Sequence, residues 1–293
     1  MRLPEPLAPT LTVPGADSLQ DAPTPSVGDL WATAWDGTDL GHVLIVAVRP
    51  THVVVWPVTD NSLAVSAPCF KVKVPNGETV LVAWPEAEAG VSTAALSTNF
   101  GAVLDADTLI QIWRSLRDST VTLDSSVDTC PLDESTEADD ALARVCDWVT
   151  LLGRLDFPDP DEVLGPLSND FMEKMAIDGR TLQQFMHDSP AIVRDTLTGR
   201  RLPTPETLSR LSQAYNTKPQ DMIVPITGAE VIELRSPARK SKITAIAHRR
   251  DITENEVRGI AWAETQLAAR QQDGSEQQQA AARVDRALEN LSI

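Results

Sequence analysis

The segment of residues 178–222 carries a dense set of helix start and stop signals. Asp178 is a favoured N-cap residue, and Ser189 and Thr204 each precede a proline that can occupy the first position of a helix. Gly199 can end the helix that begins at Ser189, because glycine adopts the left-handed backbone conformation without strain. These signals predict three short helices joined by tight connections.

The second predicted helix, residues 190–198, has one apolar side and one polar side. Val193 lies four residues before Leu197, so both should face inward. The residues that should then face outward are Ala191, Arg194, Asp195 and Thr198. Because a small residue lets the backbone approach closely while polar side chains read base edges, this pattern is typical of a recognition helix. Such a helix lies in a DNA major groove about 12 Å wide.

Each outward residue has an expected role. Arg194 is the predicted guanine contact, because its planar fork matches the two acceptors on that base edge. Asp195 either accepts a hydrogen bond from cytosine or braces Arg194. The residues predicted to hold phosphates are Arg200 and Arg201 and, more weakly, the hydroxyls of Ser189, Thr198 and Thr204.

The charge distribution singles out the same part of the chain. The net charge is -17, and residues 1–170 carry 8 Lys and Arg against 26 Asp and Glu. Residues 171–250 carry 13 against 8, and residues 251–293 carry 4 against 8. The predicted DNA-reading helices therefore lie in the one basic segment of an acidic chain.

Residues 168–224 resemble the helix-turn-helix of the phage-repressor (Cro/cI-like, XRE) family of transcriptional regulators. With Gly199 placed on that family's glycine after the recognition helix, Val193 and Leu182 fall on its buried aliphatic positions. The stretch of residues 199–211, Gly-Arg-Arg-Leu-Pro followed by Thr-Leu-Ser-Arg-Leu, is similar to the family's tail. The resemblance implies a λ-repressor-like fold and a dimer that binds double-stranded DNA.

Two positions depart from the pattern of that family. Gln183 stands where the family usually has an alanine packed against the next helix. His187 stands where it usually has the glycine of the turn.

The N-terminal part of the chain has the pattern of β-structure. Short β-branched runs separated by turn residues occur at residues 41–48, 52–59, 69–74 and 78–84, with Pro-Asn-Gly at 75–77 as a hairpin turn. Several short strands with little helix between them predict a small barrel or a curled antiparallel sheet. A helix over residues 107–116 should close this domain.

Two short sequences in this domain resemble the MazF/PemK ribonuclease toxins. These are Gly28-Asp29-Leu30-Trp31 and the strand Trp56-Pro57-Val58-Thr59. That family usually carries Arg-Pro after the glycine that aligns with Gly41, with the arginine in the catalytic site, whereas this chain has His42-Val43. A mostly neutral histidine is a poor source of the fixed cation that stabilises a phosphate transition state. The resemblance implies a toxin–antitoxin-related barrel with a degenerate site.

The expected fold class is α+β with two domains, the C-terminal one helical. The expected segments are a disordered leader at 1–27, a β domain at 28–117, an acidic linker at 118–140, the DNA-binding domain at 141–230, and a helical region at 231–293. Within the last region we expect a strand at 231–234, a helix at 240–248, and a capping box from Thr253 to Glu256. The final helix carries an apolar stripe that either docks within the chain or forms a dimer seam: Ala281, Val284, Leu288 and Leu291.

Other functional classes find no signal in the sequence. The three cysteines, Cys69, Cys130 and Cys146, have no metal-ligand spacing, and the four histidines do not pair. No run approaches the roughly 18 apolar residues of a membrane helix. We therefore expect a cytoplasmic protein without catalytic residues, cofactor or metal. The leading hypothesis is a DNA-binding regulator whose acidic domain binds a protein partner or a small-molecule signal; the alternatives are the toxin–antitoxin chain and a protein-interaction scaffold.

Overall fold

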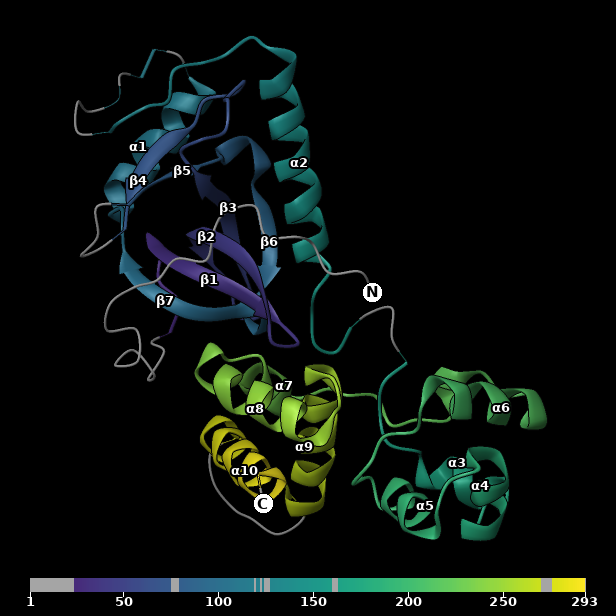
Figure 1. The fold of residues 1–293 in the computed structure, drawn as a ribbon. Helices are drawn as coiled ribbons and strands as arrows, with labels where there is room; N and C mark the ends of the chain where they lie inside the picture. The colour runs from purple at the N-terminus through teal and green to yellow at the C-terminus, as the bar shows by residue number, and fades with distance from the viewer. Residues whose placement is uncertain are drawn as a thin grey trace. The chain divides into compact units, whose positions relative to one another are not determined.

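The structure is a computed structural model that separates into two compact units. It describes residues 24–74, 79–118, 120–121, 123, 127–159, 163–269 and 276–292. Unit 1 comprises Met1–Asp156 with Arg235–Ser241, and unit 2 comprises Phe157–Leu234 with Lys242–Ile293. Most of the predicted leader and the predicted turn at 75–77 lie outside the described residues. The expected α+β class is confirmed, because unit 1 is built on a sheet and unit 2 on helices (Figure 1).

Unit 1 contains one curled antiparallel sheet, as predicted (Figure 1). Its described strands are β1 (Asp29–Trp35), β2 (Thr38–Val48), β3 (His52–Asp60), β4 (Phe70–Lys73), β5 (Val80–Ala83), β6 (Ala89–Ser92) and β7 (Leu96–Ala102). Their order is β4-β5-β3-β2-β1-β7, and β6 pairs with the first half of β3. The four runs predicted as strands coincide with β2 to β5, so the β-branched alternation was a sufficient signal there.

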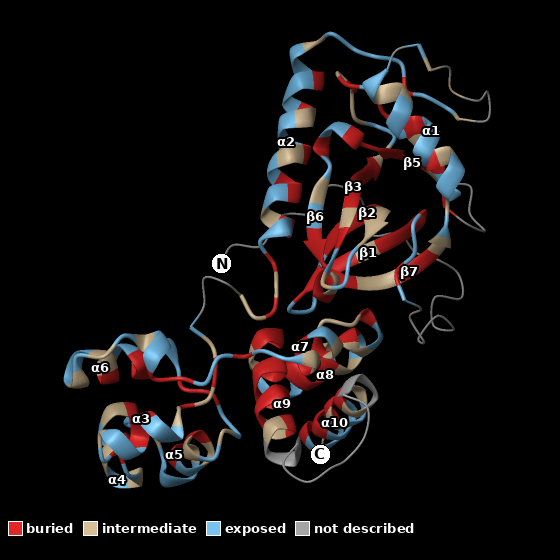
Figure 2. Cartoon of the chain, turned by 180° about the vertical axis from the view of Figure 1, so that it is seen from behind, coloured by how far each residue is buried: buried red, intermediate tan, exposed pale blue. Residues whose placement is uncertain are grey.

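Both faces of this sheet are buried (Figure 2). Along β3, Val53 and Val55 belong to one hydrophobic cluster, whereas Trp56 and Val58 belong to another. Successive side chains of a strand point to opposite faces, so the two clusters lie on the two sides of the sheet. The register of β1 against β2 shifts between Thr33 and Ala34, where a bulge changes which residues face each cluster.

Each cluster includes residues of one helix. Helix α1 (Ala106–Arg117) contributes Leu109 and Ile112 to the cluster that contains Trp56. Helix α2 (Thr136–Gly153) contributes residues to the other cluster, and its Trp148 donates an indole hydrogen bond to the carbonyl of Leu40 at 2.8 Å. Two 3-10 turns, η2 (Pro85–Ala87) and η3 (Thr93–Ala95), complete the connections.

The packing of α2 corrects two sequence-based assignments. The sequence pattern groups residues 141–155 with the DNA-binding helices, but Val145, Trp148 and Leu152 are buried in unit 1. The apolar stripe of α2 requires burial, but a stripe in the sequence does not say which surface it covers. The composition of residues 118–140 predicts a linker, yet Thr129 bridges to Phe70 and so extends the sheet edge.

Unit 2 is helical in its named elements. These are α3 (Asn169–Lys174), α4 (Gly179–Met186), α5 (Pro190–Leu197), α6 (Pro205–Tyr215), η4 (Pro219–Asp221), α7 (Ala229–Leu234), α8 (Lys240–Arg250), α9 (Glu254–Ala269) and α10 (Glu276–Leu291), with the start of α8 and η5 (Pro237–Arg239) in unit 1. Helices α3 to α6 share one hydrophobic cluster. Helices α7 to α10 share a second one.

The second cluster of unit 2 is fastened by buried ion pairs. Arg258 of α9 contacts Glu254 at 3.0 Å, and both side chains are almost fully buried. Arg283 of α10 contacts Glu230 of α7 at 2.6 Å, through two of its nitrogens. Removing one partner of such a pair leaves a buried charge uncompensated and costs several kcal/mol.

Two predictions for this region have opposite outcomes. The capping box is confirmed, because the Thr253 hydroxyl accepts from the backbone of Glu256 while the Glu256 carboxylate accepts from the backbone of Thr253. The strand predicted at 231–234 is wrong, since these residues form the end of α7. Val231 and Leu234 are buried and Ile232 is exposed, which is helical spacing rather than strand alternation.

The apolar stripe of α10 is occupied within unit 2. Val284, Leu288 and Leu291 are buried in the cluster shared with α7 and α9. Intramolecular docking, one of the two arrangements that the sequence leaves open, is therefore what the structure contains. The alternative, a dimer seam on this helix, stays a prediction, and most of the apolar residues that would form it are already buried.

We expect Gly28→Ala to destabilise unit 1 by at least about 2 kcal/mol, because strained backbone and steric overlap both oppose it. Gly28 has φ +91°, and an added Cβ atom there would overlap the Leu104 carbonyl oxygen. Urea unfolding measures the effect. The matched control is Gly90→Ala, where the nearest atom to an added Cβ is a His52 side-chain carbon at 3.5 Å. Equal stability losses in the two variants would contradict the assigned role of Gly28.

Candidate nucleic-acid interface

The three predicted N-caps of this region are all formed. The Asp178 carboxylate accepts from the Thr181 backbone at 2.8 Å. The hydroxyl of Ser189 caps α5 through the Ile192 backbone at 3.4 Å, and that of Thr204 caps α6 in the same way. Hydrogen bonds from the backbone and the hydroxyl of Thr181 lower the pKa of Asp178 below its ordinary value, with the backbone bond contributing most.

The turn between α4 and α5 contains a left-handed residue. His187 has φ +57° and ψ 24°, and its N–H donates to the Gln183 carbonyl at 3.0 Å. The Gln183 side chain in turn donates to the Asp188 carbonyl at 3.4 Å. Histidine is one of the few non-glycine residues enriched in this conformation. The two positions at which the chain departs from the repressor family thus both participate in the turn.

Helix α5 buries one side and exposes the other, as its spacing predicts. Val193 and Thr196 are buried, and Leu197 is half-buried. Ala191, Arg194 and Thr198 are exposed. Residues three and four apart share a face of a helix, so these three side chains lie in one row. Thr196, which the sequence did not mark as inward, turns its hydroxyl to the Ile192 carbonyl at 3.0 Å and so satisfies it inside the helix.

Arg194 and Asp195 form an ion pair on the surface of α5. Arg194 Nε lies 3.6 Å from a carboxylate oxygen of the half-exposed Asp195, and the Arg194 side chain is 70% exposed. This contact agrees with bracing of Arg194, one of the two predicted roles of Asp195, which stays a prediction. The Thr198 hydroxyl donates to the carbonyls of Arg194 and Asp195 at 3.0 and 3.2 Å, so its proton is not directed at a phosphate.

The loop after α5 holds the two arginines predicted to bind phosphate. The backbone N–H groups of Arg200 and Arg201 both donate to the Asp195 carbonyl, at 2.8 and 3.1 Å. Gly199 has φ +72°, and an added Cβ would lie 3.7 Å from the Cβ of Ala263 in α9. Both arginine side chains are exposed. Ser189 and Thr204 are exposed as well, with their hydroxyls engaged as helix caps.

Arg200 also has an acidic neighbour that the sequence did not reveal. Burial raises the pKa of Glu264 above its ordinary value, while Asn290, Arg250 and Arg200 oppose that rise. Within the described residues, Oε2 of Glu264 is buried without a hydrogen-bond partner. Among the causes that oppose the rise, the charge of Arg200 is the smallest, after Asn290 and Arg250.

A further positioning residue was missed. Arg210 of α6 donates to the Phe185 carbonyl near the end of α4 at 2.8 Å and pairs with Glu206 at 2.5 Å. The contact fixes α6 against the helix that precedes the turn. The only sequence signal was the four-residue spacing of Glu206 and Arg210, which predicts their pairing and says nothing of Phe185.

His42, the residue at the position of the toxin family's arginine, is a core side chain. It is 4% exposed, its ring lies 5.5 Å from that of Phe100, and burial lowers its pKa from 6.5 to about 4. Its Nδ1 atom is buried without a hydrogen-bond partner among the described residues. The imidazole is therefore neutral at pH 7 and directed away from solvent.

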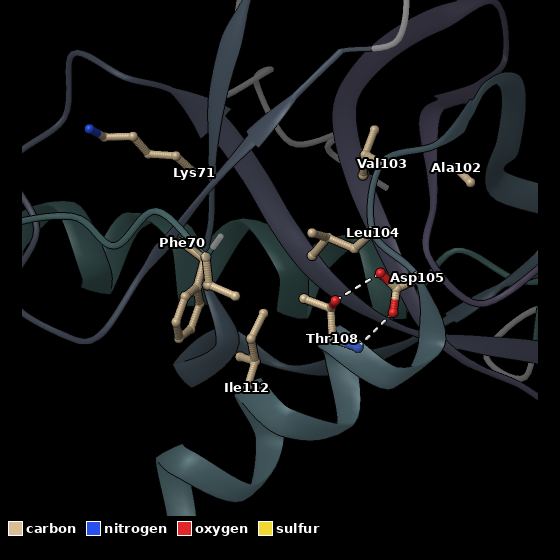
Figure 3. Close-up of a pocket in the computed structure, with 9 residues that line it drawn as sticks. Phe70, Lys71, Ala102, Val103, Leu104, Asp105, Thr108 and Ile112 are labelled. Atoms are coloured by element: carbon tan, nitrogen blue, oxygen red, sulfur yellow. Dashed lines mark hydrogen bonds between the residues drawn. The ribbon is translucent and has the colours of Figure 1, made fainter. Parts of the chain in front are cut away.

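The described residues of unit 1 form surface pockets, two of which have polar or thiol side chains in their linings. One of about 370 Å³ is lined by β4, the end of β7 and the start of α1 (Figure 3). Its polar pair, Asp105 and Thr108, is bonded to itself as the cap of α1, and Lys71 points away from it. The other pocket, of about 450 Å³, has Cys69 and Cys130 among its lining residues. Burial raises the pKa of both thiols, so neither is an activated nucleophile.

The described residues hold neither a metal-binding cluster nor a helix that could span a membrane. No group of three or more His, Cys, Asp and Glu side chains there is placed to hold a metal ion. None of the helices in this part of the chain has both the length and the apolar character needed to cross a membrane.

Titration of His42 should make stability depend on pH. Its pKa is lowered in the folded state, so its contribution is present above pH 6.5 and is lost as the pH falls through about 4. At 1.36 kcal/mol per pKa unit, the free energy of unfolding should fall by up to about 3 kcal/mol over this range. Urea titrations should show a shallower pH slope for His42→Gln than for wild type, and a wild-type slope for the exposed control His52→Gln. An identical slope in His42→Gln and wild type would overturn the assignment.

Glu264→Gln should gain stability relative to wild type as the pH rises above 4.5, the ordinary pKa of glutamate. Because burial raises the folded-state pKa, stability from the neutral carboxyl is present below that value and is lost as the pH rises through the folded pKa. Thermal unfolding at a series of pH values measures the gap between variant and wild type. Glu289→Gln, an exposed side chain of α10, is the control. A gap that narrows with rising pH would refute the expectation.

Comparisons with known proteins give no relative for this chain. No family model matches the sequence, no curated protein matches it, and no solved structure matches the fold.

Proposed function

We propose that the protein is a sequence-specific DNA-binding regulator that places α5 in the major groove of double-stranded DNA. The observation that carries this proposal is the exposed row of Ala191, Arg194 and Thr198, backed by buried Val193 and Thr196. A small residue at the start of the row lets the backbone approach the bases, and an extended arginine follows one turn later. With its side chains an α-helix is about 10–12 Å across, so a helix such as α5 fits a groove about 12 Å wide.

The connection between α4 and α5 supports a helix-turn-helix. The turn is short and contains a left-handed residue at His187. Helix α5 then begins with Ser189 as its N-cap and a proline at its first position. The resemblance to the Cro/cI-like family predicts a left-handed residue at this position, because glycine is the usual occupant there. The chain obtains the same backbone conformation with histidine, and Gln183 braces the turn.

Individual arginines, rather than net charge, support the same surface. Residues 168–224 carry 7 Lys and Arg against 7 Asp and Glu, but Arg180, Arg194, Arg200 and Arg201 are all exposed within α4, α5 and the following loop. Phosphate contacts supply sequence-independent affinity, while base contacts supply specificity. We assign the first role to Arg200 and Arg201 and the second to Arg194, which Asp195 holds in place. Thr198 contributes less, because its hydroxyl proton is directed at the carbonyls of Arg194 and Asp195. The capping hydroxyls of Ser189 and Thr204 accept from backbone N–H groups, which does not use their own O–H donors.

Unit 1 is proposed to act as the sensing or partner-binding part of the regulator. Its 450 Å³ pocket lies within the size range of small-molecule sites and has a mainly apolar lining that includes Phe70, Leu116 and Leu132. The ribonuclease alternative gains nothing from His42, because a neutral, buried imidazole supplies no cation to a phosphate. Cleavage of single-stranded RNA by the purified protein would restore that alternative.

Fluorescence anisotropy with fragments from the region upstream of its own gene tests the proposal. Arg200→Ala should weaken binding to all sequences and flatten the dependence of log affinity on log salt by about one unit. Arg194→Ala should instead reduce discrimination between operator and mutated operator, at a cost of about 1–3 kcal/mol, or roughly tenfold to a hundredfold in affinity.

Arg286→Ala is the matched control, because this arginine is exposed on α10 and away from the proposed surface residues in sequence. It removes the same charge and should leave both affinity and discrimination near wild type. Unchanged affinity of the double variant Arg194→Ala, Arg200→Ala would sink the assignment, as would an equal loss in the control.

A further inference from the structure

The outer face of α1 carries an unusual exposed stripe. Ile110 is 49% exposed and Trp113 is 41% exposed, although both are large and apolar. With exposed Asp107 one turn before and exposed Arg117 one turn after, these residues follow helical spacing on the solvent side of α1. We call Asp107, Ile110, Trp113 and Arg117 the α1 stripe. The opposite face of the helix, through Leu109 and Ile112, packs on the sheet.

Trp113 is held in place rather than loose on the surface. Its indole N–H lies 3.3 Å from a carboxylate oxygen of Glu88, which also accepts from the core residue Trp56 at 3.1 Å. The guanidinium carbon of Arg117 lies 3.4 Å from the centroid of the Trp113 ring. A side chain that is already ordered loses little entropy when a partner covers it. Tryptophan and arginine are also the residues that most often dominate binding energy at interfaces.

The order of charges along the stripe makes it self-complementary. An acidic residue lies at the start of the helix, apolar residues lie in the middle, and basic residues lie at the end. If a second α1 runs antiparallel, Asp107 of each copy meets Arg117 of the other, and Ile110 meets Trp113. Such a two-fold arrangement uses the same patch on both copies, which is the commonest form of homodimer interface. The antiparallel direction also opposes the two helix dipoles favourably.

We propose that the α1 stripe is a homodimer interface in which two α1 helices pack antiparallel. Twelve residues make a helix about 18 Å long, so the contact lies at the small end of protein interfaces. The dimer is therefore weak and salt-sensitive, because its ion pairs lie at the rim. This inference stands on unit 1 alone and does not depend on DNA binding.

Sedimentation equilibrium of the full chain over a range of concentrations tests the interface. Wild type should self-associate, and Asp107→Arg and Arg117→Asp should each weaken association at least about tenfold, because each places like charges opposite one another. Mixing the two variants should restore association. In the mixed pair, the two substituted side chains face each other with opposite charges, while native Arg117 of one copy meets native Asp107 of the other. This rescue is specific to an antiparallel, two-fold pairing.

Controls separate the interface from general charge effects and from misfolding. Asp139→Arg and Arg144→Asp make the same charge changes at exposed positions of α2 and should leave association unchanged. Trp113→Gln should abolish association, and circular dichroism establishes that each variant is folded. A wild type that remains monomeric, association that survives Asp107→Arg, or a folded pair of variants without rescue on mixing would each overturn the proposal.

Discussion

The central constraint on unit 1 is that its middle strands are buried on both faces. A sheet with alternating polar residues needs a cover on one side only, whereas β3 buries valines on one face and Trp56 and Val58 on the other. Two covers are then required, and α1 and α2 supply them. This requirement explains why the acidic segment 118–140 runs into α2, a helix that packs on the sheet. Burying both faces also leaves function to the helix surfaces, the pockets and unit 2.

Local sequence signals were sufficient to locate a helix or strand wherever the signal depends only on neighbouring residues. Capping residues before proline located α5 and α6, and β-branched alternation located β2 to β5. Signals failed where the decision depends on distant partners. The apolar stripe of α2 has to be buried, but the sequence does not show which unit it packs on. The short apolar run at 231–234 is compatible with a strand or a helix, and only its packing partners decide between them. In the candidate interface, the outward row was predictable, but the neighbours of Arg200 and Arg210 come from α9 and α4.

Unit 2 holds its arginines in two kinds of environment. Helices α7 to α10 enclose the pairs Arg258–Glu254 and Arg283–Glu230, so their charges are neutralised inside the fold. Around α5, the arginines instead reach solvent, and Arg194 pairs with the half-exposed Asp195. Buried pairs fix geometry at little net gain in stability, whereas solvated arginines keep their hydrogen-bonding capacity for an anion. Similar residue types thus serve packing in one group and are proposed to serve recognition in the other.

Glu88 joins the interior of unit 1 to its surface through a single carboxylate. Its oxygen accepts from Trp56 inside the sheet and from Trp113 outside it. If the packing around Trp56 were lost, Glu88 would no longer be fixed and the Trp113 indole would lose its hydrogen bond. Only the folded unit therefore presents the Trp113 ring in this orientation. Anything that binds there adds its own binding free energy to the unfolding equilibrium. The melting temperature of unit 1 would then report whether α1 is covered, and, with the proposed dimer, dilution alone would lower it.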